Sequence, residues 1–116
     1  MTRERYEEKA YLQALKSVLK ENLGNGGYSI FQGSLEDSVC LDWDADSRKY
    51  VVFYFERGRE HKKKYSDTFL EACSGLFTLI SHDDYELRLL QRQFVKDSAI
   101  LLLAEKTEED IKEKIV

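Results

Sequence analysis

The segment Lys49–Glu56 constrains the fold most, because apolar or aromatic side chains occupy both sets of its alternating positions. One set would lie on each face of a strand: Val51, Phe53 and Phe55 on one face, and Tyr50, Val52 and Tyr54 on the other. A strand that has no polar face must be covered on both sides, which is typical of an interior strand. The sequence therefore predicts a sheet in which this strand is central or nearly central.

Three further segments predict the strands that surround it. Tyr28–Gln32 is the first, and Ser38–Trp43 alternates apolar with polar residues, as half-buried strands do. Glu60–Tyr65 is polar and rich in lysine, which suits an exposed edge, where charge discourages the addition of another strand. Turn-forming residues lie at Asp44–Ser47 and at Arg57–Gly58. Joined in chain order, the four strands predict an antiparallel meander.

Helical patterns flank the predicted strands. Apolar residues recur at spacings of three and four within Arg3–Leu23, and glycines follow that segment. Thr68 with Glu71 three residues later is a capping box, which predicts a helix to about Ser81. After a break at residues 82–84, Tyr85–Lys96 is again typical of a helix.

The carboxy-terminal segment leaves two alternatives open. Ala99–Ala104 is compatible with a short strand or with the start of a last helix. Thr107 begins a second capping signal, so Glu108–Ile115 is predicted to be helical in either case. The predicted fold is one α+β domain over residues 1–116, with an N-terminal helix, a four-stranded antiparallel meander and two or three C-terminal helices.

The turn between the second and third strands sets which residues the helices cover. If Trp43 pairs with Lys49, the covered face carries six side chains: Val39, Leu41, Trp43, Val51, Phe53 and Phe55. A one-residue shift in pairing would replace the last three with Tyr50, Val52 and Tyr54, because the side chains of a strand alternate between faces.

Composition restricts the class of protein. Of the 116 residues, 42% are hydrophobic and 34% are charged, which is typical of a globular domain and not of a disordered chain. The longest apolar run, Ala99–Ala104, is too short for a membrane helix, and the amino terminus has no secretory signal. A reducing compartment suits the two cysteines, Cys40 and Cys73, so we expect a cytoplasmic protein that does not contact a membrane.

Residues that could carry catalysis are scattered along the sequence. His61 and His82 are the only histidines, and their spacing is not that of a zinc-binding helix. Cys40 lies within a predicted strand and Cys73 on the inner face of a predicted helix, where free cysteine behaves as a small hydrophobic residue. We therefore expect no enzyme activity, no catalytic residues, no cofactor and no metal site.

The acidic turn after the second strand resembles the opening of a calcium-binding loop. Asp42, Asp44 and Asp46 have the D-x-D-x-D spacing. The sixth position is Ser47 where the loop requires glycine, and the twelfth is Phe53 where it requires glutamate. The sequence therefore favours a solvated acidic turn over a calcium site.

A segment of mixed bases and aromatic residues suggests a second class of function. Residues 48–65 contain seven lysines and arginines interleaved with aromatic residues, a combination that can bind single-stranded nucleic acid. The predicted core requires the same aromatic residues, and the net charge of the chain is −4. A nucleic-acid-binding or adaptor module thus remains the alternative hypothesis, although nucleic acid is not the expected partner.

Four motifs, which lie between about Leu15 and Leu79, carry a resemblance to a known family. They are Tyr28-Ser29-Ile30-Phe31-x-Gly33, Val39-Cys40-Leu41-x-x-Asp44, Tyr50-Val51-Val52-Phe53-Tyr54-x-Glu56-Arg57-Gly58 and Phe69-x-Glu71-Ala72-Cys73. The chain resembles small bacterial immunity proteins of polymorphic toxin systems, in which a Y-x-V-x-Y-x-E-R-G pattern precedes an E-A-C helix. The resemblance implies a non-catalytic cytoplasmic protein that binds and neutralises a cognate toxin domain, and it transfers no catalytic residues. Homodimerisation is left open.

The acidic turn and two tyrosines are the candidate partner-binding residues: Asp42, Asp44, Asp46, Tyr50 and Tyr54. Acidic residues accelerate the capture of a basic partner such as a nuclease toxin, and tyrosine is enriched among the residues that contribute most to binding energy. The alternative is that the aspartates only solvate turns and that the tyrosines pack under the C-terminal helices.

Overall fold

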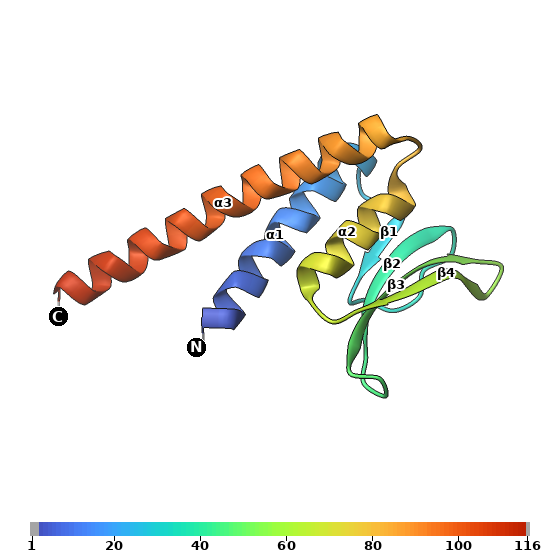
Figure 1. Cartoon of the computed structure of the whole chain (residues 1–116), viewed down its shortest axis with the longest axis horizontal. Coiled ribbons are helices and arrows are strands. Elements are labelled where there is room, and N and C mark those ends of the chain that lie inside the picture. Colours follow the sequence, from blue (N-terminus) through green and yellow to red (C-terminus); the bar gives the residue numbers. More distant parts are fainter. Residues whose placement is uncertain (1–2, 116) are drawn as a thin grey trace.

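A computed structural model describes the backbone of residues 3–115 and the side chains of residues 9–103. The chain contains α1 (Arg3–Leu23), β1 (Tyr28–Ile30), β2 (Ser38–Asp44), β3 (Lys49–Glu56), β4 (Arg59–Ser66), α2 (Phe69–Ile80) and α3 (Asp84–Ile115). The strands form one mixed sheet in the order β1-β2-β3-β4, and the three helices lie together on one side of it (Figure 1). The architecture is α+β, as the sequence predicts.

The first strand corrects the predicted meander, because β1 runs parallel to β2 and not antiparallel. Ile30 pairs with Leu41, and the backbone N–H of Phe31 donates to the carbonyl of Leu41 at 2.9 Å. Parallel neighbours usually need a crossover of a dozen or more residues. Here β1 has only three residues and spans about 10 Å. The loop of residues 31–37 can therefore return to the level of Tyr28 without a helix.

The predicted positions of the third and fourth strands are confirmed. β3 lies between β2 and β4, so it is an interior strand, whereas β4 is an edge strand with exposed side chains from Arg59 to Tyr65. The pairing of β3 with β4 is irregular between Val52 and Tyr54, and Lys62 has a φ of 54°. This irregularity and the lysines make β4 a poor template for another strand.

The predicted pairing of β2 with β3 is wrong by one residue. Trp43 pairs with Tyr50, and Asp44 pairs with Lys49, so four residues close the turn. The carboxylate of Asp44 accepts hydrogen bonds from the backbone N–H of Asp46 at 3.2 Å and from the hydroxyl of Ser47 at 2.9 Å. Because these local bonds tighten the turn, the strands stay paired one residue beyond Trp43.

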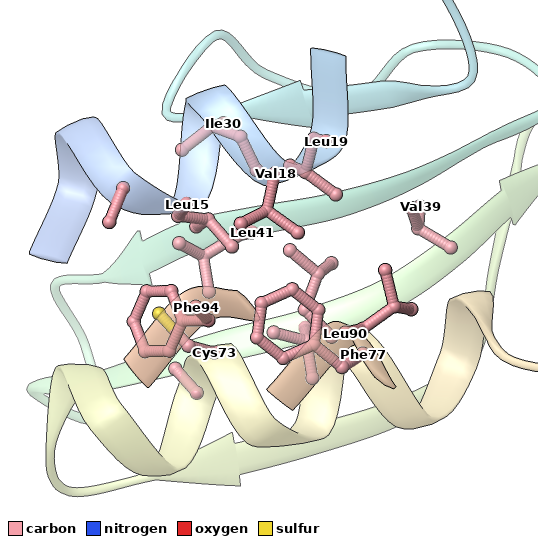
Figure 2. Close-up of a cluster of buried hydrophobic side chains, with 14 of the residues drawn as sticks. Leu15, Val18, Leu19, Ile30, Val39, Leu41, Cys73, Phe77, Leu90 and Phe94 are labelled. Atoms are coloured by element: carbon pink, nitrogen blue, oxygen red, sulfur yellow. The ribbon is translucent and has the colours of Figure 1, made fainter. Parts of the chain in front are cut away.

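The shifted pairing changes the face that the helices cover. Tyr50, Val52 and Tyr54 join Val39 and Leu41 in the main core, where α1, α2 and α3 contribute most of the remaining side chains (Figure 2). Figure 2 labels ten of the core residues: Leu15, Val18, Leu19, Ile30, Val39, Leu41, Cys73, Phe77, Leu90 and Phe94. The ring of Phe77 from α2 meets the ring of Phe94 from α3 at 5.3 Å.

A second apolar cluster lies on the opposite face of the sheet. It consists of Cys40, Val51 and Phe53, with Phe55 packed against it. Both faces of β3 are therefore buried against other side chains, which accounts for a strand without a polar face.

The carboxy-terminal segment forms one helix of 32 residues, so α2 and α3 are the two C-terminal helices. Residues 99–104 lie within α3, which resolves their ambiguity in favour of helix. The predicted helix over Glu108–Ile115 is confirmed for the backbone, but it is the continuation of α3 and does not begin at Thr107. Asp83 caps the start of α3, because its carboxylate accepts a hydrogen bond from the backbone N–H of Glu86 at 2.8 Å. No described helix is both long enough and apolar enough to cross a bilayer.

Candidate functional site

Four aromatic rings gather at the end of the sheet where the β2–β3 turn lies. We call Phe31, Trp43, Tyr50 and Phe69 the aromatic cluster. The ring of Trp43 meets that of Tyr50 edge-on at 4.9 Å, and Tyr50 meets Phe69 edge-on at 5.6 Å. Phe31 stacks on Phe69 at 6.2 Å. Trp43 comes from β2 and Tyr50 from β3, whereas Phe31 lies in the loop directly after β1 and Phe69 is the first residue of α2.

The outer rings of the aromatic cluster remain open to solvent. Trp43 is 46% exposed and Phe31 is 38% exposed, whereas Phe69 is buried. Tyr50 lies between them and is half-buried against the main core. Phe69 and Tyr50 are therefore packed against the core, whereas the rings of Trp43 and Phe31 present an apolar surface to solvent.

Phe31 adopts a backbone conformation that favours glycine. Its φ is 57°, in the left-handed region, and Gly33 in the same loop has a φ of 87°. For a residue with a Cβ atom this conformation costs about 1–2 kcal/mol. The hydrogen bond from its N–H to Leu41 and the stacking of its ring on Phe69 hold Phe31 there.

The acidic turn, formed by Asp42, Asp44 and Asp46, lies at the end of the β2–β3 hairpin. Asp46 is exposed at the turn, while Asp42 and Asp44 lie on the face of the sheet opposite Trp43, because they alternate with it along β2. A fourth carboxylate, Asp67, lies at this end and forms an ion pair with Lys49 at 3.5 Å. Asp42 accepts a hydrogen bond from the backbone N–H of Trp43 at 2.9 Å.

The structure brings together part of the predicted partner-binding set. Tyr50 lies near the acidic turn, but its ring supports Trp43 and packs on Phe69. Tyr54 lies at the other end of β3, where burial and the carboxylates of Glu56, Asp37 and Glu36 raise the pKa of its hydroxyl. Tyr54 is thus separate from Asp42, Asp44 and Asp46, and the packing alternative for both tyrosines accounts for their half-buried positions.

Trp43 and Phe31 are the exposed aromatic residues that sequence reasoning missed. The period-2 pattern of β2 placed Trp43 on the covered face, and that face is indeed the one toward the helices. The pattern does not reveal that Trp43, although it lies on the face toward the helices, remains 46% exposed. The sequence feature that could have indicated this exposure is the position of Trp43 directly before the turn-forming residues.

Groups that could perform catalysis lie apart from this cluster. Burial raises the pKa of the Cys73 thiol and of the Cys40 thiol, which disfavours the reactive thiolate. His61 faces the carbonyl of Glu56 at 3.3 Å, and His82 lies exposed before α3. Among the described side chains, no hydrogen bond links either histidine to a cysteine or to a serine hydroxyl. The same part of the chain contains no group of three metal-ligating residues.

The basic and aromatic segment at residues 48–65 is divided between environments. Phe53 is buried on one face of the sheet, while Tyr50 and Tyr54 pack toward the helices. Tyr65 is exposed, and the ammonium of Lys63 lies 5.3 Å from the centre of its ring. Lys63 also pairs with Glu60 at 2.8 Å, and these contacts raise its pKa. The rings of this segment therefore do not form a continuous platform for stacked bases.

No family model, curated protein or solved structure matches this chain. The arrangement of the described residues is thus the basis for the functional argument that follows.

Proposed function

We propose that this chain is a non-catalytic immunity protein, which binds and neutralises a cognate bacterial toxin domain in the cytoplasm. The observation that carries the proposal is an exposed aromatic cluster beside an acidic turn. Exposed apolar patches with a polar rim mark protein interaction sites, and aromatic residues dominate binding energy at such sites. Stoichiometric inhibition requires a stable surface of this kind and no reactive group.

The charge at this end favours a basic partner. Asp42, Asp44 and Asp46 fall within five positions, and the next base in the sequence is Arg48. Asp67 adds a fourth carboxylate, which Lys49 partly neutralises. Complementary charge raises the rate of association with a basic protein such as a nuclease, and salt screens this effect.

The test is the association of this chain with the toxin domain encoded by a neighbouring gene, measured by stopped-flow at low and at high salt. We expect the triple change Asp42→Asn, Asp44→Asn and Asp46→Asn to slow association about tenfold at low salt. The difference should shrink as salt is added. Co-expression of the wild-type chain should also restore the growth of cells that express the toxin domain.

A matched variant controls for net charge. Asp37→Asn, Asp84→Asn and Asp97→Asn remove the same three charges from other parts of the surface, and this variant should associate at a rate close to that of the wild type. Unchanged kinetics of the first variant at both salt concentrations would move the interface elsewhere. Failure of the wild-type chain to bind the toxin domain or to restore growth would overturn the proposed function.

A further inference from the structure

The aromatic cluster has the organisation of a preformed receptor for a side chain. Tyr50 holds Trp43 from one edge, and Phe69, which is 6% exposed, supports both Tyr50 and Phe31 from below. Rings that are held before binding lose little conformational freedom when a partner arrives. By contrast Tyr85, on α3, is 72% exposed, and no other described ring packs against it. Exposure alone therefore does not distinguish the aromatic cluster from a single exposed ring such as Tyr85. The distinguishing feature is that its exposed rings pack against other rings.

Phe31 widens the exposed apolar surface of the aromatic cluster. A glycine at this position would adopt the left-handed backbone without strain, yet the chain has a phenylalanine with a φ of 57°. Its ring extends the apolar surface from Trp43 and Tyr50 across to the start of α2. Asp37, Arg48, Arg57 and Lys62 adopt the same backbone region, so what distinguishes Phe31 is the large, partly exposed ring that it carries in this conformation.

The charge around the rings favours one kind of side chain as the bound group. The faces of aromatic rings attract cations, and tryptophan does so most strongly. The exposed carboxylates of Asp46 and Asp67 lie at the same end of the sheet, where Lys49 pairs with Asp67 at 3.5 Å and Arg48 lies in the turn. Together with Asp42 and Asp44, the carboxylates at this end outnumber these two cations, so the net charge favours a cation over an acidic side chain. A guanidinium group is planar, stacks on aromatic faces and can bind a carboxylate through two parallel hydrogen bonds, which an ammonium group cannot do.

We propose that the aromatic cluster binds an arginine side chain of the protein partner, stacked on Trp43 and paired with a carboxylate at the same end. This inference rests on the proposed function for the identity of the partner, but its chemistry can be tested without that partner. It makes Trp43 and Phe31 the anchors of the interface, and it makes Tyr50 and Phe69 their support.

Intrinsic fluorescence provides the first test, because Trp43 is the single tryptophan of the chain. The probes are three peptides that alternate glycine with arginine, with lysine or with glutamate. We expect a saturable change in Trp43 emission with the arginine peptide, binding at least threefold weaker with the lysine peptide, and no response to the glutamate peptide. The response should weaken in the double variant Asp46→Asn and Asp67→Asn, which removes the two carboxylates that the inference uses, and persist in Tyr85→Leu, the control for an exposed ring elsewhere.

The second test uses the toxin domain and equilibrium affinity. Trp43→Leu should weaken binding about thirtyfold, as expected for a residue that dominates an interface, whereas Tyr85→Leu should change it less than twofold. Circular dichroism and a thermal melt establish that each variant is folded. Phe31→Gly, which keeps the loop conformation, should weaken binding in the same direction and serves if Trp43→Leu fails to fold.

The outcomes separate the inference from the proposed function. If the wild-type chain binds the toxin domain, but Trp43→Leu binds it equally well and the arginine peptide leaves the emission unchanged, the inference is overturned and the proposed function stands. If the toxin domain does not bind, the proposed function fails, and the fluorescence titration still decides whether the aromatic cluster accepts arginine. Equal responses to the arginine and lysine peptides would overturn the preference for a planar cation.

Discussion

The two ends of the sheet use carboxylates differently. At the β3–β4 hairpin, both carboxylate oxygens of Glu36 accept hydrogen bonds from backbone N–H groups, one from Arg57 and one from Gly58 at 3.4 Å. This contact ties the loop after β1 to a turn more than twenty residues away. At the β2–β3 turn, the hydrogen bonds found to Asp42 and Asp44 in the described part of the chain come from residues within three positions of them.

The difference indicates which acidic residues stabilise the fold and which are available to a partner. Arg57 and Gly58 have φ values of 53° and 71°, as the mirror-image turn of a two-residue hairpin requires, and arginine is poorly suited to the first of these positions. The carboxylate of Glu36 compensates by binding the two exposed amides of this turn. Among the described residues, no long-range hydrogen bond to Asp42, Asp44 or Asp46 is found, and these carboxylates lie at the same end of the sheet as the exposed rings of Trp43 and Phe31.

The largest effect should follow from removing the long-range contact. We expect Glu36→Ala to lower the free energy of unfolding by about 1–2 kcal/mol, because two hydrogen bonds to a charged acceptor are lost at a partly solvated site. Chemical denaturation measures this change. Glu36→Gln, which retains one acceptor oxygen, should lose less. If Asp46→Ala destabilises the chain as much as Glu36→Ala, the two ends are not different in the way proposed.

A smaller effect should reveal the strain at Phe31. Phe31→Gly and Phe31→Ala remove the same ring, but only glycine adopts a φ of 57° without a penalty. We expect the glycine variant to be more stable than the alanine variant by about 1 kcal/mol, as measured by thermal or chemical unfolding. Equal stabilities would show that the backbone relaxes once the ring is removed, and they would weaken the argument that the ring is held for binding.

The smallest effect concerns the loop that carries Glu36. Cys40 is buried, the backbone of Leu35 lies against its thiol, and burial raises the thiol pKa. Release of the loop in Glu36→Ala should therefore increase the rate at which a thiol reagent labels Cys40 severalfold, and labelling should accelerate as the pH rises toward the raised pKa. Cys73, which lies in the main core, should remain unlabelled in the native protein and serves as the internal control. Mass spectrometry of digested samples distinguishes the two thiols. Equal labelling of both cysteines would indicate global unfolding instead of local opening.

Local patterns predicted most of the secondary structure. The expected bounds of α1 and β3 are those observed, and Thr68 caps α2 by accepting from the backbone N–H of Glu71 at 3.2 Å. These features depend on periodicity and on hydrogen bonds between residues a few positions apart. The start of α3 after His82 follows from the same kind of signal, a capping aspartate.

The predictions were wrong where the structure depends on residues that are distant in sequence, or on the hydrogen bonds that form within a single turn. The direction of β1 depends on the path of residues 31–37, which no periodicity specifies. The pairing of Trp43 with Tyr50 depends on the hydrogen bonds that the carboxylate of Asp44 makes inside the turn. The restart expected at Thr107 relied on a capping residue that also fits inside a helix, and residues 84–115 continue without interruption.

The candidate site shows the same division between local and distant effects. The sequence by itself determined that an acidic turn follows β2 and that aromatic residues occupy both faces of β3, because residue type and the alternation of a strand are local properties. Only the tertiary structure decided which rings stay exposed. The packing of the helices on the sheet separates Tyr50 and Tyr54 from solvent in part, leaves Trp43 exposed, and places Phe31 against Phe69. Exposure depends on what covers a side chain, and the residues that do so come from distant parts of the chain.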